Sequence, residues 1–309
     1  MTCWKINTRF LIISDAHSRP FPDDRVPLTP VDVAIHCGDL TQNSKLHEFE
    51  SAINLLKELD APLKLVIAGN HDFTLDKSTY KRMIAGPSPD NMWRVENEYG
   101  YFGEARRLME SAAEYGIVYL DEGIHHFDFD NGAHLVVYAS PYTLSEDPWG
   151  FQYNIFEGHD WKINEQVDVM ITHGPPLQIL DQGRHQKHIG CPDLFRAVAQ
   201  AKPLMHCFGH AHRSWGAELI QWRDYRPGEL SPATAINKSE SIVLESLDKV
   251  EWGRKQYEKD RVVVTRHGRD DYMQVVRKVD TLFVNAAIQG RKKSSFNFPW
   301  VVELDLPIS

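Results

Sequence analysis

Five apolar runs of strand length, each ending abruptly at glycine and polar residues, constrain the fold of this chain more than any other feature. They are RFLIISDAH (9–17), VDVAIHCGD (31–39), LKLVIAGNHD (63–72), VDVMITHGPP (167–176) and PLMHCFGHAH (203–212). Runs that are apolar on both faces are typical of strands buried in mostly parallel sheets. If helices connect these strands by right-handed crossovers, the polar ends of the strands meet at one sheet edge. Ligands bind at that carboxyl edge in open α/β sheets.

Three segments between and beside these runs are predicted to be helices. They cover residues 44–60, 103–116 and 191–201. The last of them has a proline near its start and Asp193 in its first turn, and both features are typical of a helix beginning. Strands and helices therefore alternate, and we expect an α/β protein.

Composition and charge limit the class of protein. The 309 residues are 42% apolar and 25% charged, which is ordinary for a globular chain with a sizeable core. The net charge of −9 disfavours nucleic acid as a partner. The four cysteines show no CxxC spacing, and no segment is typical of a signal peptide or a membrane helix. We therefore expect a soluble, cytoplasmic protein that binds neither nucleic acid nor membrane.

The polar residues at the strand ends form a set of side chains suited to binding metal ions. Asp15 and His17 are two positions apart, as are His210 and His212, so each pair can direct two ligands to one place. The full set offers three oxygen ligands and four nitrogen ligands: Asp15, His17, Asp39, Asn70, His173, His210 and His212. Such a mixture suits Mn, Fe or Zn better than Ca or Mg.

Seven ligands are too many for one tetrahedral ion, but they fit two ions that share the carboxylate of Asp39. Asp or His after a single strand usually forms a turn or caps a helix. The same residue types after all five strands favour a common site instead. We therefore predict two transition-metal ions as the cofactor.

Two metal ions about 3.5–4 Å apart can generate hydroxide at neutral pH and bind both oxygens of an in-line displacement at phosphorus. His71 follows Asn70 directly, and on an extended backbone its side chain should point away from it. We predict that His71 is the catalytic acid, or a positive charge on the transition state, oriented by Asp72 or Asp39. The alternative is a structural histidine next to the ligands.

The blocks DAH, GD, GNHD, THG and GHAH, in this order, resemble the signature blocks of the calcineurin-like metallophosphoesterases. The resemblance covers roughly residues 8 to 215 and resumes near the C-terminus. Further stretches resemble the brain-type metallophosphoesterase-domain phosphodiesterases and their fungal relatives: SDAHSR (14–19), THGPP (172–176), FGHAH (208–212), VNAA (284–287) and the closing VVELDLP (301–307).

This resemblance implies a fold, a ligand assignment and an activity. The fold would be a two-sheet β-sandwich flanked by helices, with a dimetal site at the C-terminal edge of the strands. His71 would be the catalytic histidine, and a metal-bridging hydroxide would be the nucleophile. The first metal would be bound by Asp15, His17, Asp39 and His212, and the second by Asp39, Asn70, His173 and His210.

We expect one domain over residues 1–309, with an elaboration at about 213–280 that looks longer than the family's usual connection. We predict that it shapes or covers the active site, with a helix over 239–261 and with Arg223 and Arg226 near a substrate anion. The alternative is an outer decoration or a dimer contact.

A few further residues are candidates for substrate contact. Arg19 follows the first block closely enough to reach a phosphate, and His185 and His188 lie in the polar loop after THGPP. Each of the three is otherwise a surface residue. The aromatic residues between Trp149 and Trp161 could form the wall of a base-binding pocket, or pack in the core beneath a loop.

The leading hypothesis is a metal-dependent phosphodiesterase or phosphomonoesterase that acts on a small molecule, with cyclic nucleotides among the candidates. One alternative is a dimetal enzyme that acts on a non-phosphate bond in a specialised pathway. Another is a catalytically silent binding protein with the same fold, which would be expected to have lost ligands. A phosphoprotein phosphatase is less attractive because the sequence shows no obvious basic groove for a charged peptide.

Overall fold

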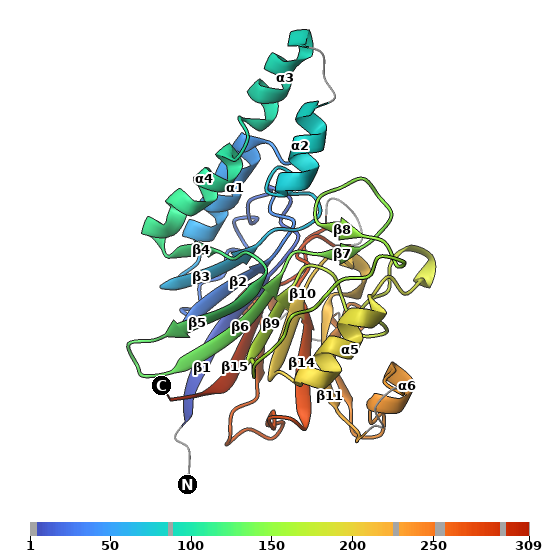
Figure 1. The fold of residues 1–309 in the computed structure, drawn as a ribbon. Coiled ribbons are helices and arrows are strands. Elements are labelled where there is room, and N and C mark those ends of the chain that lie inside the picture. The colour runs from blue at the N-terminus through green and yellow to red at the C-terminus, as the bar shows by residue number, and fades with distance from the viewer. Residues whose placement is uncertain (1–4, 86–88, 225–228, 251–256, 291–294, 309) are drawn as a thin grey trace.

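The computed structural model contains two β-sheets that face each other, with helices on their outer sides (Figure 1). It describes residues 5–85, 89–224, 229–250, 257–290 and 295–308. The six-stranded sheet has the order β13 (Val263–Arg266), β15 (Trp300–Pro307), β1 (Lys5–Ile13), β2 (Val33–Cys37), β3 (Leu63–Ile67) and β4 (Ile117–Tyr119). The seven-stranded sheet has the order β12 (Ile242–Ser246), β11 (Gly216–Gln221), β14 (Asp280–Asn285), β10 (Met205–Phe208), β9 (Val169–Thr172), β6 (His134–Ser140) and β5 (Gly123–Asp128). The predicted two-sheet sandwich is confirmed.

The alternation of side chains along β1 shows how the layers are built. Phe10 and Ile12 point into the core between the two sheets, whereas Leu11 and Ile13 pack in the layer under the helices. All four side chains are at most 1% exposed. A strand that is buried on both faces must be apolar at every position, which accounts for the unbroken apolar runs of the sequence.

The helices cover the outer faces of the sheets. The outer face of the six-stranded sheet packs against α1 (Leu46–Lys57) and α4 (Glu104–Ser111), which is continued by a 3-10 turn over Ala112–Tyr115. The outer face of the seven-stranded sheet packs against α5 (Pro192–Ala201). These helices confirm the three predicted ones. Sequence analysis missed α2 (Lys77–Ala85) and α3 (Pro89–Tyr99), which project beyond the sheets in Figure 1.

All five predicted strands are present, and they run parallel within their sheets. In the first sheet β1, β2 and β3 are parallel neighbours, and in the second sheet β9 and β10 are parallel neighbours. The carboxyl ends of the five strands therefore lie at the same end of the sandwich. The expectation of a shared polar edge is confirmed, with two sheets contributing to it instead of one.

The described parts of the stretch from 213 to 280 belong largely to the sheets, and its role in shaping or covering the active site stays a prediction. β11 and β12 extend the seven-stranded sheet beside β14, and β13 pairs with β15 in the other sheet. The short helix α6 (Pro232–Ala235) lies between β11 and β12. Arg223 follows the end of β11 that is remote from His212, and Arg226 lies outside the described residues.

The prediction of a helix over 239–261 is wrong in its first part, because residues 242–246 form the edge strand β12. The apolar spacing that suggested a helix is equally compatible with a strand, and pairing with β11 decides between them. Residues 251–256 of this segment lie outside the described part of the chain. Across the described ranges, no helix combines the length and apolar character that a bilayer crossing requires.

Candidate metal centre

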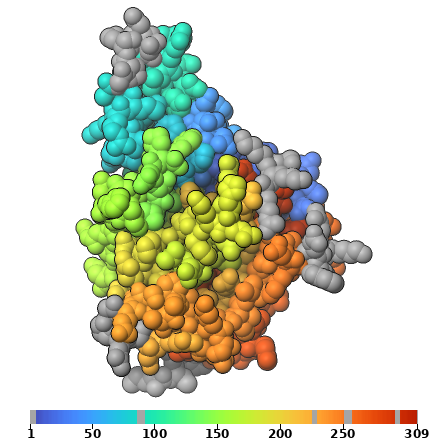
Figure 2. Space-filling model, turned by 90° about the vertical axis from the view of Figure 1, so that its right-hand side faces the viewer, coloured from blue at the N-terminus to red at the C-terminus, as the bar shows by residue number. Residues whose placement is uncertain are grey.

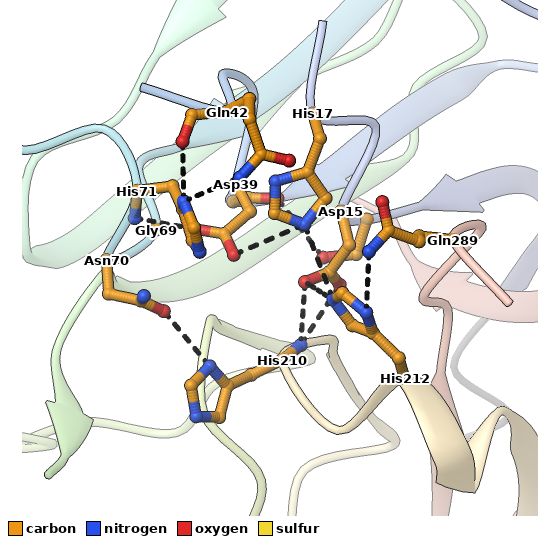
Figure 3. A network of polar contacts seen from close by, with 12 residues as sticks. Asp15, His17, Asp39, Gln42, Gly69, Asn70, His71, His210, His212 and Gln289 are labelled. Atoms are coloured by element: carbon orange, nitrogen blue, oxygen red, sulfur yellow. Dashed lines mark hydrogen bonds and ion pairs between the residues drawn. The ribbon is translucent and has the colours of Figure 1, made fainter. Parts of the chain in front are cut away.

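The structure brings all seven predicted ligand residues together at the carboxyl edge of the sandwich, and Figure 3 shows all of them except His173 labelled. Each of them follows a strand: Asp15 and His17 after β1, Asp39 after β2, Asn70 after β3, His173 after β9, and His210 and His212 after β10. Five turns from two sheets thus converge on one point. The ligand atoms of Asp15, His17, Asp39 and His212 form one group, and those of Asp39, His173 and His210 form a second.

In the first group the nitrogen and oxygen atoms lie close to one another. Nε2 of His212 is 3.0 Å from Oδ1 of Asp15 and 3.4 Å from Nε2 of His17. Nε2 of His17 is 3.7 Å from Oδ2 of Asp39. Two imidazole nitrogens and two carboxylates that face a common point form a donor set that fits a transition-metal ion.

The second group shares Asp39 and adds Asn70. Nε2 of His173 is 3.4 Å from Oδ1 of Asp39 and 3.0 Å from the amide oxygen of Asn70. Nδ1 of His210 is also 3.0 Å from that amide oxygen. One oxygen of Asp39 thus faces each group, as a carboxylate that bridges two ions requires. The donor set fits the two-ion site that the family resemblance implied.

Hydrogen bonds on the outer side of the rings fix which nitrogen faces the centre. Nδ1 of His17 donates to the carbonyl oxygen of Thr41 at 3.2 Å, and Nδ1 of His173 donates to that of Cys37 at 2.9 Å. Nδ1 of His212 contacts the side-chain amide of Gln289 at 3.1 Å. The two carbonyl contacts leave Nε2 of His17 and His173 available as a metal ligand, and the contact with Gln289 directs Nε2 of His212 toward the centre. Sequence reasoning missed them because two of the three partners are backbone carbonyls.

Strained backbone marks the same place. Asp15, His17, Asp39 and His210 have positive φ angles of 57°, 48°, 55° and 62°. Residues other than glycine rarely adopt this left-handed conformation, and such strain collects at functional sites. It persists because the surroundings enforce it: for example, the backbone N–H of His210 donates to Oδ2 of Asp15 at 3.0 Å.

Gly69 allows two ligand-bearing turns to approach each other closely. A Cβ atom at this position would lie 2.3 Å from the backbone nitrogen of Asp39 and 2.4 Å from its Oδ1. We therefore expect Gly69→Ala to displace Asp39 and to lower the metal content of the purified protein. Gly123→Ala is the control for backbone strain away from the centre, since its φ of 143° disfavours alanine but its Cβ would meet nothing within 4 Å. Elemental analysis checks this; equal metal contents in both variants and the wild type would contradict it.

The buried charges at the centre balance one another. Burial alone would raise the pKa of Asp39, but His173 and His71 hold it well below its usual range. Burial alone would lower the pKa of His173, but the adjacent Asp39 raises it to about 9. Burial lowers the pKa values of His17 and His210 to about 4 each. In the metal-free protein, a protonated His173 therefore supplies part of the positive charge that metal ions would supply.

Metal binding is accordingly expected to release a proton. Because the pKa of His173 in the folded, metal-free chain is about 9, a metal ion must displace a proton at pH 7. The apparent affinity of the second group should rise with pH by up to about tenfold per unit between pH 7 and 9. Calorimetry in buffers with different ionisation enthalpies measures the released proton. A pH-independent affinity with no proton release would contradict this assignment.

His71 lies beside both groups, and its ring is held by the backbone. Its Nδ1 donates to the carbonyl oxygen of Gln42 at 2.7 Å, and its backbone N–H donates to Oδ1 of Asp39 at 2.9 Å. Its ring centroid is 4.8 Å from that of His17 and 4.3 Å from that of Trp149. The prediction that Asp72 or Asp39 orients the ring is therefore wrong, because the carbonyl oxygen of Gln42 holds the ring.

The carboxylate of Asp72 holds the turns of the centre together. It accepts hydrogen bonds from the backbone N–H groups of Leu40, Thr41 and Gly69 at 3.0, 2.8 and 2.8 Å. Burial and the nearby Asp39 raise its pKa to about 6. Asp72 thus joins the turns after β2 and β3. Its contacts indicate that it holds these ligand-bearing turns together and does not contact the ring of His71.

The three possible substrate contacts have different surroundings. The guanidinium of Arg19 lies 5.9 Å from the ring of Phe296. His185 is exposed on a short 3-10 turn, and Nδ1 of His188 lies 2.6 Å from Oδ1 of Asp181. Substrate contact by these three residues stays a prediction.

The chain belongs to the calcineurin-like phosphoesterase family, whose sequence pattern matches residues 8–214. It is 32% identical to human metallophosphoesterase domain-containing protein 1 over 217 residues, which cover 68% of this chain and 62% of that protein. It is 27% identical to UPF0046 protein T07D4.2 of Caenorhabditis elegans, with coverages of 68% and 52%.

Two further similarities concern a longer protein and a solved structure. A probable rhamnogalacturonate lyase C of Emericella nidulans is 31% identical over 217 residues, which cover 69% of this chain but 18% of that protein. Because the match covers so small a part of that protein, its name says nothing about the function of this chain. The structure of TT1561 from Thermus thermophilus aligns with a TM-score of 0.43 at 12% identity, covering 66% of this chain and 82% of that one.

Proposed function

We propose that this chain is a dimetal-dependent hydrolase of small phosphoesters, acting as a phosphodiesterase or phosphomonoesterase. The observation that carries the proposal is the pair of ligand groups that share Asp39, with the ring of His71 beside them. Family membership supports a hydrolase. A silent binding protein would be expected to have lost ligands, and every position of the predicted set is filled by a residue of the expected type.

The residues of the two groups would hold Mn, Fe or Zn ions, since imidazole and carboxylate ligands suit these metals. When bound, such a pair of ions supplies Lewis acidity and makes hydroxide available at neutral pH. The protein itself fixes the ligands by strained turns and by hydrogen bonds on the outer side of the rings. That fixed geometry spares the site from reorganising during the reaction.

His71 would protonate the leaving oxygen. Because Nδ1 of His71 donates to the carbonyl oxygen of Gln42, the ring can direct Nε2 toward a substrate. A general acid must come within hydrogen-bond reach of the atom that it protonates, and the position of His71 beside Asp39 and His17 supports this role.

The negative net charge of the chain fits a small substrate bound locally by metal ions better than a nucleic acid. We place the activity in the cytoplasm, and cyclic nucleotides remain among the candidate substrates. No basic groove for a phosphoprotein is evident in the sequence.

A substrate panel tests the proposal. Protein stripped with a chelator and reloaded separately with Mn, Fe or Zn would be assayed against nitrophenyl phosphate, bis(p-nitrophenyl) phosphate and cyclic nucleotides. We expect hydrolysis that the chelator abolishes and one of these metals restores. Metal-loaded protein that hydrolyses none of these phosphoesters would contradict the proposal and favour chemistry at a non-phosphate bond.

A further inference from the structure

Trp149 lies directly against the proposed catalytic acid. Its ring centroid is 4.3 Å from that of His71, with 38° between the ring planes, and 6.0 Å from that of Phe73. If His71 protonates the leaving oxygen, the atoms next to that oxygen must lie within a few ångströms of the acid. The group that departs therefore comes close to the indole of Trp149.

A groove continues outward from Trp149, and we call it the leaving-group groove. Its volume is about 330 Å³, within the range of small-molecule sites. Arg82 of α2 lines one side, and the rest of the lining lies between residues 145 and 157, in the segment that follows the strand β7 (Thr143–Leu144) and contains β8 (Gln152–Tyr153). In Figure 2 the green segment that includes this loop lies next to the cyan segment that includes α2. Its lining includes Arg82, Glu146, Asp147, Trp149 and Glu157.

The loop that carries Trp149 is fixed to the metal-ligand turn. The backbone N–H of Gly150 donates to the carbonyl oxygen of Asn70 at 3.1 Å, and that of Phe151 donates to Oδ2 of Asp76 at 2.9 Å. A Cβ atom at Gly150 would lie 2.6 Å from Cα of Phe73, so glycine permits this close approach. Trp149 is thus held in a set position relative to the proposed ligand Asn70.

The charges of the groove are unequal. Glu146, Asp147 and Glu157 supply three carboxylates against the one guanidinium of Arg82. All three carboxylates are exposed, and that of Asp147 accepts a hydrogen bond from the hydroxyl of Ser145 at 3.3 Å. The groove therefore repels a leaving group that carries its own negative charge, and the repulsion should weaken as salt screens it. The flat indole favours a planar ring by stacking.

We infer that the leaving-group groove holds the departing alcohol of the substrate, and that this alcohol carries a planar ring and no negative charge. The inference rests on the proposed function and narrows its substrate class. Esters of neutral ring-bearing alcohols would be good substrates, whereas esters whose leaving group carries a further phosphate or carboxylate would be poor ones.

Variants at Trp149 test the stacking. The probes are phenyl methyl phosphate and trifluoroethyl methyl phosphate, whose leaving groups differ in having a ring. Trp149→Ala should lower kcat/KM roughly tenfold more for the phenyl ester, and Trp149→Phe should restore most of the difference. Equal losses for both esters would show that Trp149 only positions His71. An unchanged kcat/KM for both esters would show that Trp149 neither positions His71 nor stacks on the leaving group. Either result would overturn the inference.

A charge variant tests the exclusion of anions. The triple change Glu146→Gln, Asp147→Asn and Glu157→Gln should raise kcat/KM for 4-carboxyphenyl methyl phosphate about three- to tenfold relative to the 4-nitrophenyl ester. The difference should shrink in about 1 M NaCl. An unchanged ratio would overturn the inference while leaving the proposed function intact. Failure of the metal-loaded wild type to hydrolyse any of these esters would instead overturn the proposed function, and this inference with it.

Discussion

Replacing Asp39 by asparagine should deplete both metals at once, because each oxygen of its carboxylate faces one of the two ligand groups. Removing an outer partner of a ligand already lowers metal affinity roughly 10–100-fold, so we expect a loss of about 100-fold or more for a shared ligand. The change also removes a negative charge that balances His17 and His173. Metal content after dialysis against limiting metal measures the effect at each site.

Asp280→Asn is the matched control for this variant. Asp280 is a buried carboxylate that accepts a hydrogen bond from the backbone of Val276, and it begins β14 at the edge remote from the metal centre. The control should keep wild-type metal content and activity. If Asp39→Asn retained both metals while the control behaved as expected, Asp39 would not be a shared ligand.

Replacing His71 by alanine should preserve both metals yet lower kcat by about 10²–10⁴-fold for substrates with poor leaving groups, the range for a lost general acid. The loss should be smaller for an activated ester such as nitrophenyl phosphate, whose leaving group hardly needs a proton. Steady-state kinetics on both esters, with metal content measured in parallel, separates these effects.

His125→Ala serves as the control for a change at histidine, because His125 lies on the edge strand β5 and contacts the carbonyl oxygen of Asp121. It should have wild-type kinetics. Equal losses for poor and activated leaving groups in His71→Ala would indicate that His71 acts on transition-state charge or on binding instead of donating a proton.

The strand ends were predictable from sequence because both their chemistry and their position follow from local patterns. An apolar run such as Phe10 to Ile13 identifies a buried strand, and the side chains that follow it identify metal-binding chemistry. Parallel pairing then forces such ends together. The sharing of Asp39 between two groups was also predictable, because seven ligands exceed what one tetrahedral ion accepts.

The contacts that orient the rings were not predictable from residue types. The carbonyl oxygens of Cys37, Thr41 and Gln42 hold three histidines, and every residue has a carbonyl oxygen. The role of Asp72 was misjudged for a related reason. Its place next to His71 in the sequence suggested a contact with the ring, whereas the turn directs its carboxylate to backbone N–H groups.

The segment after His212 was misread because long-range pairing overrides local spacing. Val243 and Leu247 are spaced as on one face of a helix, yet the strand over 242–246 is fixed by its partner β11. The propensity of a strand depends on its neighbours in the sheet, and no local window contains them. A variant lacking 220–275 would lose strands from both sheets, so we expect it to unfold.

The number of metal ions bound per chain tests the central claim most directly. Wild-type protein loaded with Mn, Fe or Zn and freed of excess metal would be analysed for its elements alongside Asp39→Asn. We predict about two ions per wild-type chain and fewer than one in the variant. Wild-type protein with no metal above background, or with one ion whose binding is unchanged in the variant, would contradict a dimetal centre built around Asp39.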